Sequence, residues 1–146
     1  MLHKTLRNQP KYNGGLGAII LGAGKSSRMD SFDKVLEPIL AKPTITYSLN
    51  ILDKCQQIDE IILVMGKHNL KEGKTLVENG SWNKISRICQ GGARRQDSVR
   101  LGLECLAPLK WVLIHDGARP CLDDSIVTRG LEAVTETGAA VAAVPV

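Results

Sequence analysis

A loop near the N-terminus combines glycines with two basic side chains. It reads GAGKSSRM over residues 22–29 and is followed by Lys34. Two glycines directly after an apolar run let backbone N–H groups approach an anion closely. Arg28 and Lys34 can add bidentate and point-charge contacts to phosphate. A glycine turn between a strand and a helix would explain the glycines but not the two cations, so the loop favours phosphate binding.

Two familiar phosphate motifs do not describe this loop. A Walker A loop needs a glycine five residues before Gly24, where Ile19 stands. The dinucleotide fingerprint needs Gly or Ala at the position of Ser27, and no acidic residue follows at the end of a second strand in the right context. The loop is therefore expected to bind phosphate in another way.

A second glycine-bearing loop reads GGARRQDSV over residues 91–99. The backbone of Gly91, Gly92 and Ala93 can hydrogen-bond a flat base while Ser98 points to the same ligand. A serine at the start of a helix also serves as an N-cap, and this second role is favoured when the loop is considered alone. Both interpretations stay open.

A third loop, HDGARP over residues 115–120, places a carboxylate at the end of an apolar run. Asp116 can hold Mg²⁺ directly or through water, or it can bind a ribose hydroxyl. Arg119 can hold an anionic substrate. A Ser-His-Asp triad is disfavoured because the adjacent His115 and Asp116 point to opposite faces of a strand. His115 is therefore expected to be a packed side chain.

Short apolar runs alternate with amphipathic segments along the chain, which predicts a parallel α/β fold. Strands are expected at residues 16–21, 60–65, 85–89, 111–115 and 139–144. Helices are expected at residues 43–55, 69–78, 98–106 and 124–136, the last one capped by Asp123 or Asp124. Right-handed crossovers place helices on both faces of such a sheet, and ligands bind outside the carboxyl ends of its strands. The three loops should therefore meet at one edge of a three-layer, mostly parallel sheet.

Length and composition indicate one globular domain with a basic tail. The chain has 146 residues, 43% hydrophobic and 23% charged, and no apolar run approaches the ~20 residues that cross a bilayer. Residues 1–15 hold three positive charges of the net +4, so the domain at residues 16–146 is nearly neutral, which argues against a nucleic-acid surface. The four cysteines form no C-x-x-C pair. Reduced thiols and a cytoplasmic location are expected.

The three loops together resemble a known family. AIILGAGKSSRM with Lys34, then GGARRQDSV, then WVLIHDGARPC, each after a predicted strand, are similar to the motifs of the 2-C-methyl-D-erythritol 4-phosphate cytidylyltransferases of the non-mevalonate isoprenoid pathway. The likeness runs over residues 16–146. It implies a Rossmann-like nucleotidyltransferase fold and transfer of the cytidylyl group of CTP to the sugar-alcohol phosphate. Pyrophosphate would be released with the help of Mg²⁺ or another divalent cation, without a covalent enzyme intermediate.

The resemblance also implies roles for individual residues. Arg28 and Lys34 would be catalytic and hold the triphosphate, Arg119 would bind the methylerythritol phosphate, and Asp116 would lie at the metal. The nucleotide-binding positions would be Leu21, Gly22, Ala23, Gly24, Gly91, Gly92, Ala93, Ser98, Asp116 and Gly117.

The sequence departs from the family pattern in several places. Ser26 stands where the family often has Gly, Gly117 where Ala is usual, and Asp33 where Pro commonly precedes the Lys. Family members continue into a Thr-bearing loop, a β-arm that joins two subunits and a second phosphate-binding Lys, so the C-terminal part is expected to be missing here. Full-length members are expected to be homodimers. Two alternatives remain: a nucleotidyltransferase for another alditol or sugar phosphate, and a truncated, non-catalytic nucleotide-binding remnant.

Overall fold

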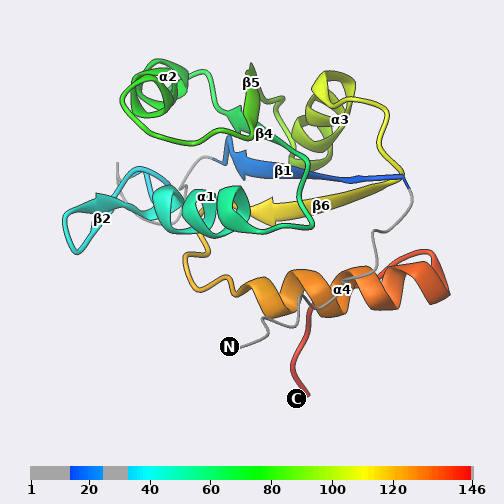
Figure 1. The fold of residues 1–146 in the computed structure, drawn as a ribbon. Helices are drawn as coiled ribbons and strands as arrows, with labels where there is room; N and C mark the ends of the chain where they lie inside the picture. The colour runs from blue at the N-terminus through cyan, green and yellow to red at the C-terminus, as the bar shows by residue number, and fades with distance from the viewer. Residues whose placement is uncertain (1–13, 25–32, 146) are drawn as a thin grey trace, which may run out of the picture.

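The computed structural model describes residues 14–24 and 33–145. Within these ranges, four parallel strands form one sheet in the order β5-β4-β1-β6 (Figure 1). The strands are β1 (Leu16–Gly22), β4 (Glu60–Met65), β5 (Ile85–Gln90) and β6 (Trp111–Asp116). The helices are α1 (Thr44–Lys54), α2 (Leu70–Glu78), α3 (Arg95–Cys105) and α4 (Asp124–Thr137). All four of these strands and all four helices were predicted from the sequence, with ends that differ by up to three residues.

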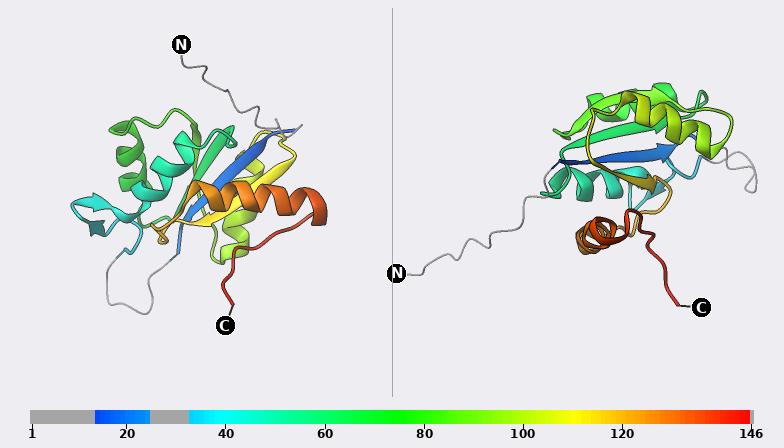
Figure 2. Two further views of the ribbon diagram at one scale, coloured as in Figure 1. Left: turned by 60° about the horizontal axis from the view of Figure 1, so that its bottom comes forward. Right: turned by 90° about the vertical axis from the view of Figure 1, so that its right-hand side faces the viewer.

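Strands β1 and β4 are apolar along their length because side chains cover both faces of the sheet. On one face Ile20 packs in a cluster with Leu49 of α1 and Leu131 of α4. On the other face Ile19 packs in a cluster with Val99 of α3. Figure 2 shows α1 and α4 on one side of the sheet and α3 on the other. The predicted three-layer arrangement is confirmed.

Helix α3 begins before the predicted position. Its first residue is Arg95, and the Asp97 carboxylate accepts the backbone N–H of Arg94 at 3.1 Å, which caps the first turn. Ser98 therefore lies inside the helix, and the interpretation of Ser98 as the N-cap is wrong. At α4 the cap is Asp123, whose side chain accepts the N–H of Ser125 at 2.7 Å.

The strand predicted at residues 139–144 is not present. Helix α4 ends at Gly138, whose φ is 80°, and the chain then runs away from the sheet (Figure 1). Val141 and Val144 are 91% and 83% exposed. β-branched residues favour a strand when they can pair with a neighbouring strand and pack against a covering layer. In this structure the sheet ends at β6, so this segment has no strand to pair with among the described residues. Composition alone could not show which strand, if any, lies beside this segment.

A short hairpin between β1 and α1 was not predicted. Strands β2 (Pro38–Ile39) and β3 (Lys42–Pro43) pair antiparallel around Leu40 and Ala41. Both turn residues have positive φ, 49° and 64°. Glycine and asparagine usually take such positions, so the turn carries none of its usual sequence signals.

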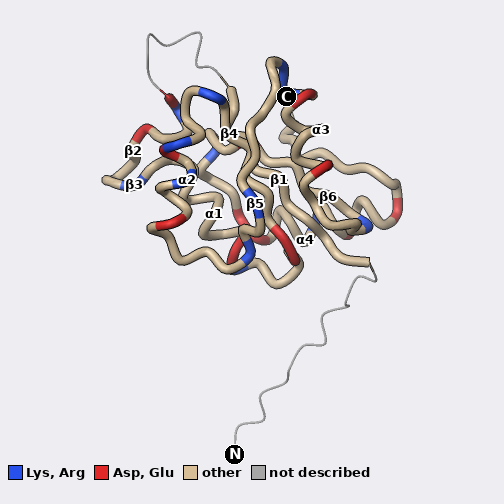
Figure 3. The backbone as a smooth tube through the Cα atoms, turned by 90° about the horizontal axis from the view of Figure 1, so that it is seen from above, with Lys and Arg blue, Asp and Glu red and all other residues tan. Residues whose placement is uncertain are grey.

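Basic and acidic residues are interspersed along the described chain (Figure 3). The expected basic tail falls almost entirely on residues 1–13, which lie outside the described residues. None of the helices in the described ranges is long and apolar enough to cross a membrane.

Candidate functional site

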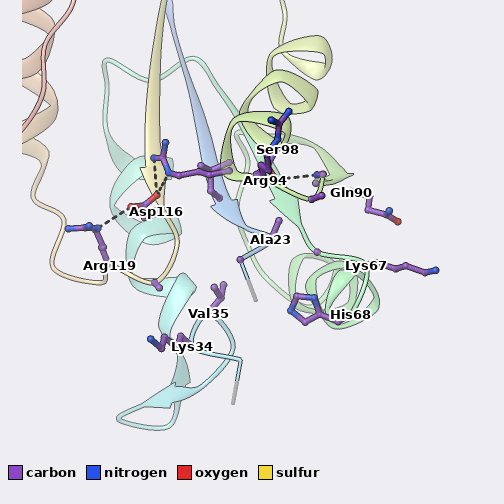
Figure 4. A pocket seen from close by; sticks show the side chains of 18 residues that line it. Ala23, Lys34, Val35, Lys67, His68, Gln90, Arg94, Ser98, Asp116 and Arg119 are labelled. Atoms are coloured by element: carbon purple, nitrogen blue, oxygen red, sulfur yellow. Dashed lines mark hydrogen bonds and ion pairs between the residues drawn. The ribbon is translucent and has the colours of Figure 1, made fainter. Parts of the chain in front are cut away.

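A cleft of about 1300 Å³ opens at the carboxyl ends of the sheet strands (Figure 4). It is lined by residues from the ends of β1, β4, β5 and β6 and from the segment before β2. The sequence-predicted residues that line it are Leu21, Ala23, Gly24, Lys34, Gly91, Gly92, Ala93, Ser98, Asp116 and Arg119. The expectation that the three loops meet at one edge is confirmed.

Of the predicted residues that the structure describes, Gly22 and Gly117 do not line the cleft. The carbonyl of Gly22 accepts a hydrogen bond from Asn69 at 3.0 Å, and the N–H of Gly117 donates to the carbonyl of Leu21 at 2.8 Å. Gly22 and Gly117 therefore help to build the wall of the cleft. Arg28 lies outside the described residues.

The loop after β5 is held together by Ser98. This side chain is 3% exposed, and its hydroxyl accepts the N–H of Gly92 at 3.2 Å and donates to the carbonyl of Arg94 at 3.3 Å. The N–H of Gly91 donates to the carbonyl of Met65 at 2.7 Å. The backbone N–H groups of Gly91 and Gly92 are thus used inside the protein and are not free to bind a ligand.

Gly91 is required by close approach of the first and second loops. A Cβ added there would lie 2.5 Å from the Cβ of Ala23 and 2.6 Å from the hydroxyl oxygen of Ser98. Any larger residue would push these two loops apart. The glycine therefore allows the ends of β1 and β5 to form one continuous wall.

Asp116 lies between two guanidinium groups (Figure 4). Its Oδ1 accepts from Nε and Nη2 of Arg95 at 3.2 and 2.9 Å, and its Oδ2 accepts from Nε of Arg119 at 3.1 Å. Partial burial alone would raise the pKa of Asp116, but the hydrogen bonds and charges of Arg95 and then Arg119 outweigh it and lower the pKa. The carboxylate is therefore ionised at neutral pH and orients both arginines at the cleft.

His115 points to the opposite side of β6 from Asp116. Its Nε2 lies 2.8 Å from the hydroxyl of Ser48 and 3.0 Å from the carbonyl oxygen of Arg119. The same hydroxyl donates to that carbonyl at 3.0 Å. Burial, the largest influence, lowers the pKa of His115. The prediction of a packed histidine is confirmed, and this histidine fixes the backbone that carries Arg119.

Sequence reasoning missed the part of the cleft that follows β4. Gly66, Lys67 and His68 line it, and Lys67 and His68 appear on the side opposite Asp116 and Arg119 (Figure 4). The sequence could have predicted this part of the cleft, because the residues that follow each strand of a parallel sheet lie at the same edge of that sheet. Arg95 was also missed, although it stands inside the second motif.

One carboxylate of the cleft can hold a divalent cation. Among the described residues no three His, Cys, Asp or Glu side chains gather as a metal-binding group. Mg²⁺, however, is commonly bound through one or two carboxylates and completed by phosphates and water. Among residues 14–24 and 33–145, only Arg119 donates a hydrogen bond to Asp116 Oδ2, so this oxygen keeps a lone pair that a cation can use. The donor set fits a cation that arrives with a phosphate ligand.

The fold and the cleft define a parallel α/β domain with basic side chains and one carboxylate at the carboxyl edge of its sheet, where such domains bind their ligands. Residues 16–146 match the protein-family model described as "IspD: 2-C-methyl-D-erythritol 4-phosphate cytidylyltransferase". The chain belongs to this cytidylyltransferase family and has its Rossmann-like nucleotidyltransferase fold.

Individual relatives agree with this assignment. Two proteins from Dehalococcoides mccartyi strains, both named 2-C-methyl-D-erythritol 4-phosphate cytidylyltransferase, are 44% and 47% identical over 133 residues. Each match covers 91% of this chain and 59% of the relative. The crystal structure of 4-diphosphocytidyl-2C-methyl-D-erythritol synthase from Anaerococcus prevotii aligns with a TM-score of 0.70 at 27% identity, over 84% of this chain and 52% of that one. The chain therefore spans between half and three-fifths of the length of these proteins.

Proposed function

We propose that the chain carries the CTP-binding part of an enzyme that transfers the cytidylyl group of CTP to 2-C-methyl-D-erythritol 4-phosphate. The products are 4-diphosphocytidyl-2-C-methyl-D-erythritol and pyrophosphate, in the non-mevalonate route to isoprenoid precursors. The observation that carries this proposal is the meeting of all three family motifs at one cleft. The family match over residues 16–146 supports it.

The base and ribose bind between the first and second loops in this proposal. Residues 21–24 and 91–93 form the two walls, and Ala93 N–H and neighbouring carbonyls meet the cytosine. Ser98 affects binding of the base indirectly, because its buried hydroxyl accepts the N–H of Gly92 and so fixes the loop that contacts the base. Asp116 binds the ribose or the cation at the other end of the cleft.

The phosphates bind to the basic side chains. Lys34 and Arg28 hold the triphosphate. Arg119 uses Nε for Asp116 and keeps its two terminal nitrogens for the phosphate of the second substrate. Asp116 would hold Mg²⁺ or another divalent cation, directly or through water, and the cation would supply charge that offsets the phosphates.

The reaction needs positioning and charge stabilisation rather than a covalent enzyme intermediate. A phosphate oxygen of the methylerythritol phosphate attacks the α-phosphorus of CTP. A new P–O bond forms and the bond to pyrophosphate breaks. Lys34 and Arg28 stabilise the negative charge that builds on the oxygens of the transferred phosphoryl group and on the leaving pyrophosphate. Arg28→Ala should weaken CTP binding by roughly 1.5–3 kcal/mol, the range for charge-assisted hydrogen bonds.

Two measurements test the proposal. Calorimetric titration of this chain with CTP and Mg²⁺ should show binding, and Arg28→Ala should weaken it. Pyrophosphate release should require CTP, methylerythritol phosphate and Mg²⁺ together, measured on this chain and on any longer product encoded by the same reading frame. Release with ribitol phosphate in place of methylerythritol phosphate would contradict the substrate assignment. Binding of CTP without release from either product would support the non-catalytic alternative.

The remaining expectations are part of the same proposal. The partners are CTP and a small sugar-alcohol phosphate, and the whole enzyme is a homodimer. A cytoplasmic location is consistent with the four cysteines, all of which are free thiols in the structure.

A further inference from the structure

Asn69 is a buried polar side chain at the junction of the first loop and the Lys34 segment. It is 2% exposed and stands at the start of α2. Its Nδ2 donates to the carbonyl of Gly22 at 3.0 Å and also to the carboxylate of Asp33. Both neighbours are acceptors, so the amide can only present its NH₂ group to them. The side-chain amide of Asn69 therefore links the end of β1 to the residue directly before Lys34.

Asp33 is in turn hydrogen-bonded to the backbone around Lys34. Its Oδ1 accepts the N–H of Val35 at 3.1 Å, and its carbonyl accepts the N–H groups of Leu36 and Glu37 at 3.0 and 2.8 Å. Val35 is anchored again on its other side, where its carbonyl accepts the N–H of Ile45 at 3.0 Å. Lys34 is thus the residue between two fixed neighbours, and it faces the cleft.

The amide of Asn69 is costly where it lies. Its Oδ1 is buried and has no hydrogen-bond partner among the described residues. A buried polar atom without a partner lowers stability, while the Nδ2 of the same amide supplies a donor to the carbonyl of Gly22 and to the carboxylate of Asp33. His68 adds a second contact to the same acceptor, with Nε2 3.4 Å from Asp33 Oδ2. The amide of Asn69 and the ring of His68 therefore both lie against the same oxygen of Asp33.

We propose that Asn69 is a positioning residue for phosphate binding, which holds Asp33 against Gly22 so that the Lys34 ammonium faces the triphosphate. This inference rests on the proposed function, because it assigns the triphosphate as the ligand of Lys34. Asn69 itself does not touch the ligand. Its effect should therefore appear in the binding of the β- and γ-phosphates and should disappear when Lys34 is absent.

The test compares CTP with CMP, each with Mg²⁺, in calorimetric titrations of the full 146-residue chain. The main variant is Asn69→Leu, which removes the donor without adding charge, and Asn69→Ala serves as a second variant in case leucine is not accommodated. Either variant should weaken CTP binding about ten-fold, the loss of a charge-assisted contact, and change CMP binding much less. Leu76→Ala in α2, the helix that Asn69 precedes, is the matched control, since it should lower stability and leave the CTP-to-CMP ratio unchanged.

A double-mutant cycle shows whether Asn69 acts through Lys34. Lys34→Ala should weaken CTP binding, and adding Asn69→Leu to it should cause almost no further loss. If the two losses simply multiply, or if Asn69→Leu binds both nucleotides like the unmodified chain, the positioning role is wrong while the proposed function stands. If the unmodified chain binds no CTP, both the proposed function and this inference fail.

Discussion

Replacement of Asp116 by asparagine tests whether the arginine pair of the cleft is organised by one ionised carboxylate. The variant Asp116→Asn keeps the shape of the side chain and removes its charge. It weakens three N–H···O contacts of 2.9–3.2 Å, two from Arg95 and one from Arg119. Two guanidinium groups then face each other across a neutral amide.

The expected loss of stability is modest because the side chains of both arginines are largely exposed to solvent. The side chains of Arg95 and Arg119 are 61% and 78% exposed, and that of Asp116 is 36% exposed. Exposed ion pairs contribute about 0.2–1 kcal/mol each, so the two pairs together should contribute roughly 1 kcal/mol. For a domain of this size that corresponds to a Tm lower by about 3–5 °C.

The same pair predicts a pH dependence with a definite sign. The pKa of Asp116 is lowered in the folded protein despite partial burial, chiefly by Arg95 and then by Arg119. Its stabilising contribution is therefore fully present above the unfolded pKa of about 3.9 and is lost as the pH falls through the folded pKa. The difference in unfolding free energy between the two proteins should be largest near neutral pH and vanish in acid.

Urea denaturation followed by circular dichroism, at neutral pH and at the lowest pH where both proteins fold, measures this difference. Glu104→Gln is the matched control, since it removes a carboxylate that pairs with Arg100 on the outer surface of α3. The control should lose less stability than Asp116→Asn. A pH-independent difference for Asp116→Asn, or a loss of several kcal/mol, would refute the account of a partly exposed, ionised carboxylate.

Three further predictions concern backbone geometry and the partly buried His115. Gly91→Ala should lower the free energy of unfolding by about 1–3 kcal/mol through overpacking and weaken CTP binding, whereas Gly130→Ala, where a Cβ meets nothing within 4 Å in α4, should raise stability by about 0.5–1 kcal/mol. Equal effects in denaturant titrations would contradict this. Ala41→Gly should raise Tm, since Ala41 has a φ of 64° and glycine accepts that conformation freely; a lower Tm would show that the turn is not strained. His115 has a pKa lowered by burial, so its contribution is present above about pH 6.5 and lost as the pH falls through the folded pKa. His115→Gln should flatten the decline of Tm between about pH 7 and pH 5, and an unchanged decline would place its cause elsewhere.

The sequence was sufficient to predict the sheet and the place of the cleft. Strands β1 and β4 are continuous apolar runs, and only a sheet covered on both faces buries such runs completely. Once the strands are parallel, their carboxyl ends share one edge, so residues as far apart as Gly24 and Asp116 must come together. The packed position of His115 followed from the alternation of side chains along a strand.

The sequence pattern was not sufficient where secondary structure depends on contacts with a neighbouring strand or residue. Residues 139–144 have the composition of a strand but no strand beside them in the structure. Ser98 is of a residue type that often caps helices, but the N-cap of α3 is Arg94, whose N–H donates to Asp97, and the serine hydroxyl accepts from Gly92 instead. In the first case the outcome depends on whether another strand lies alongside, and in the second it depends on the neighbouring residue Asp97. Local propensity encodes neither.

Residue types and their order along the chain therefore determined the parallel architecture, the three loops and the kind of ligand they suit, because periodicity and strand direction are local properties. Only the tertiary structure decided that Arg95 and Arg119 share Asp116, and that Asn69 joins Gly22 to Asp33. Such contacts depend on how separate elements are positioned relative to one another, and these positions are set by how the helices pack on the sheet.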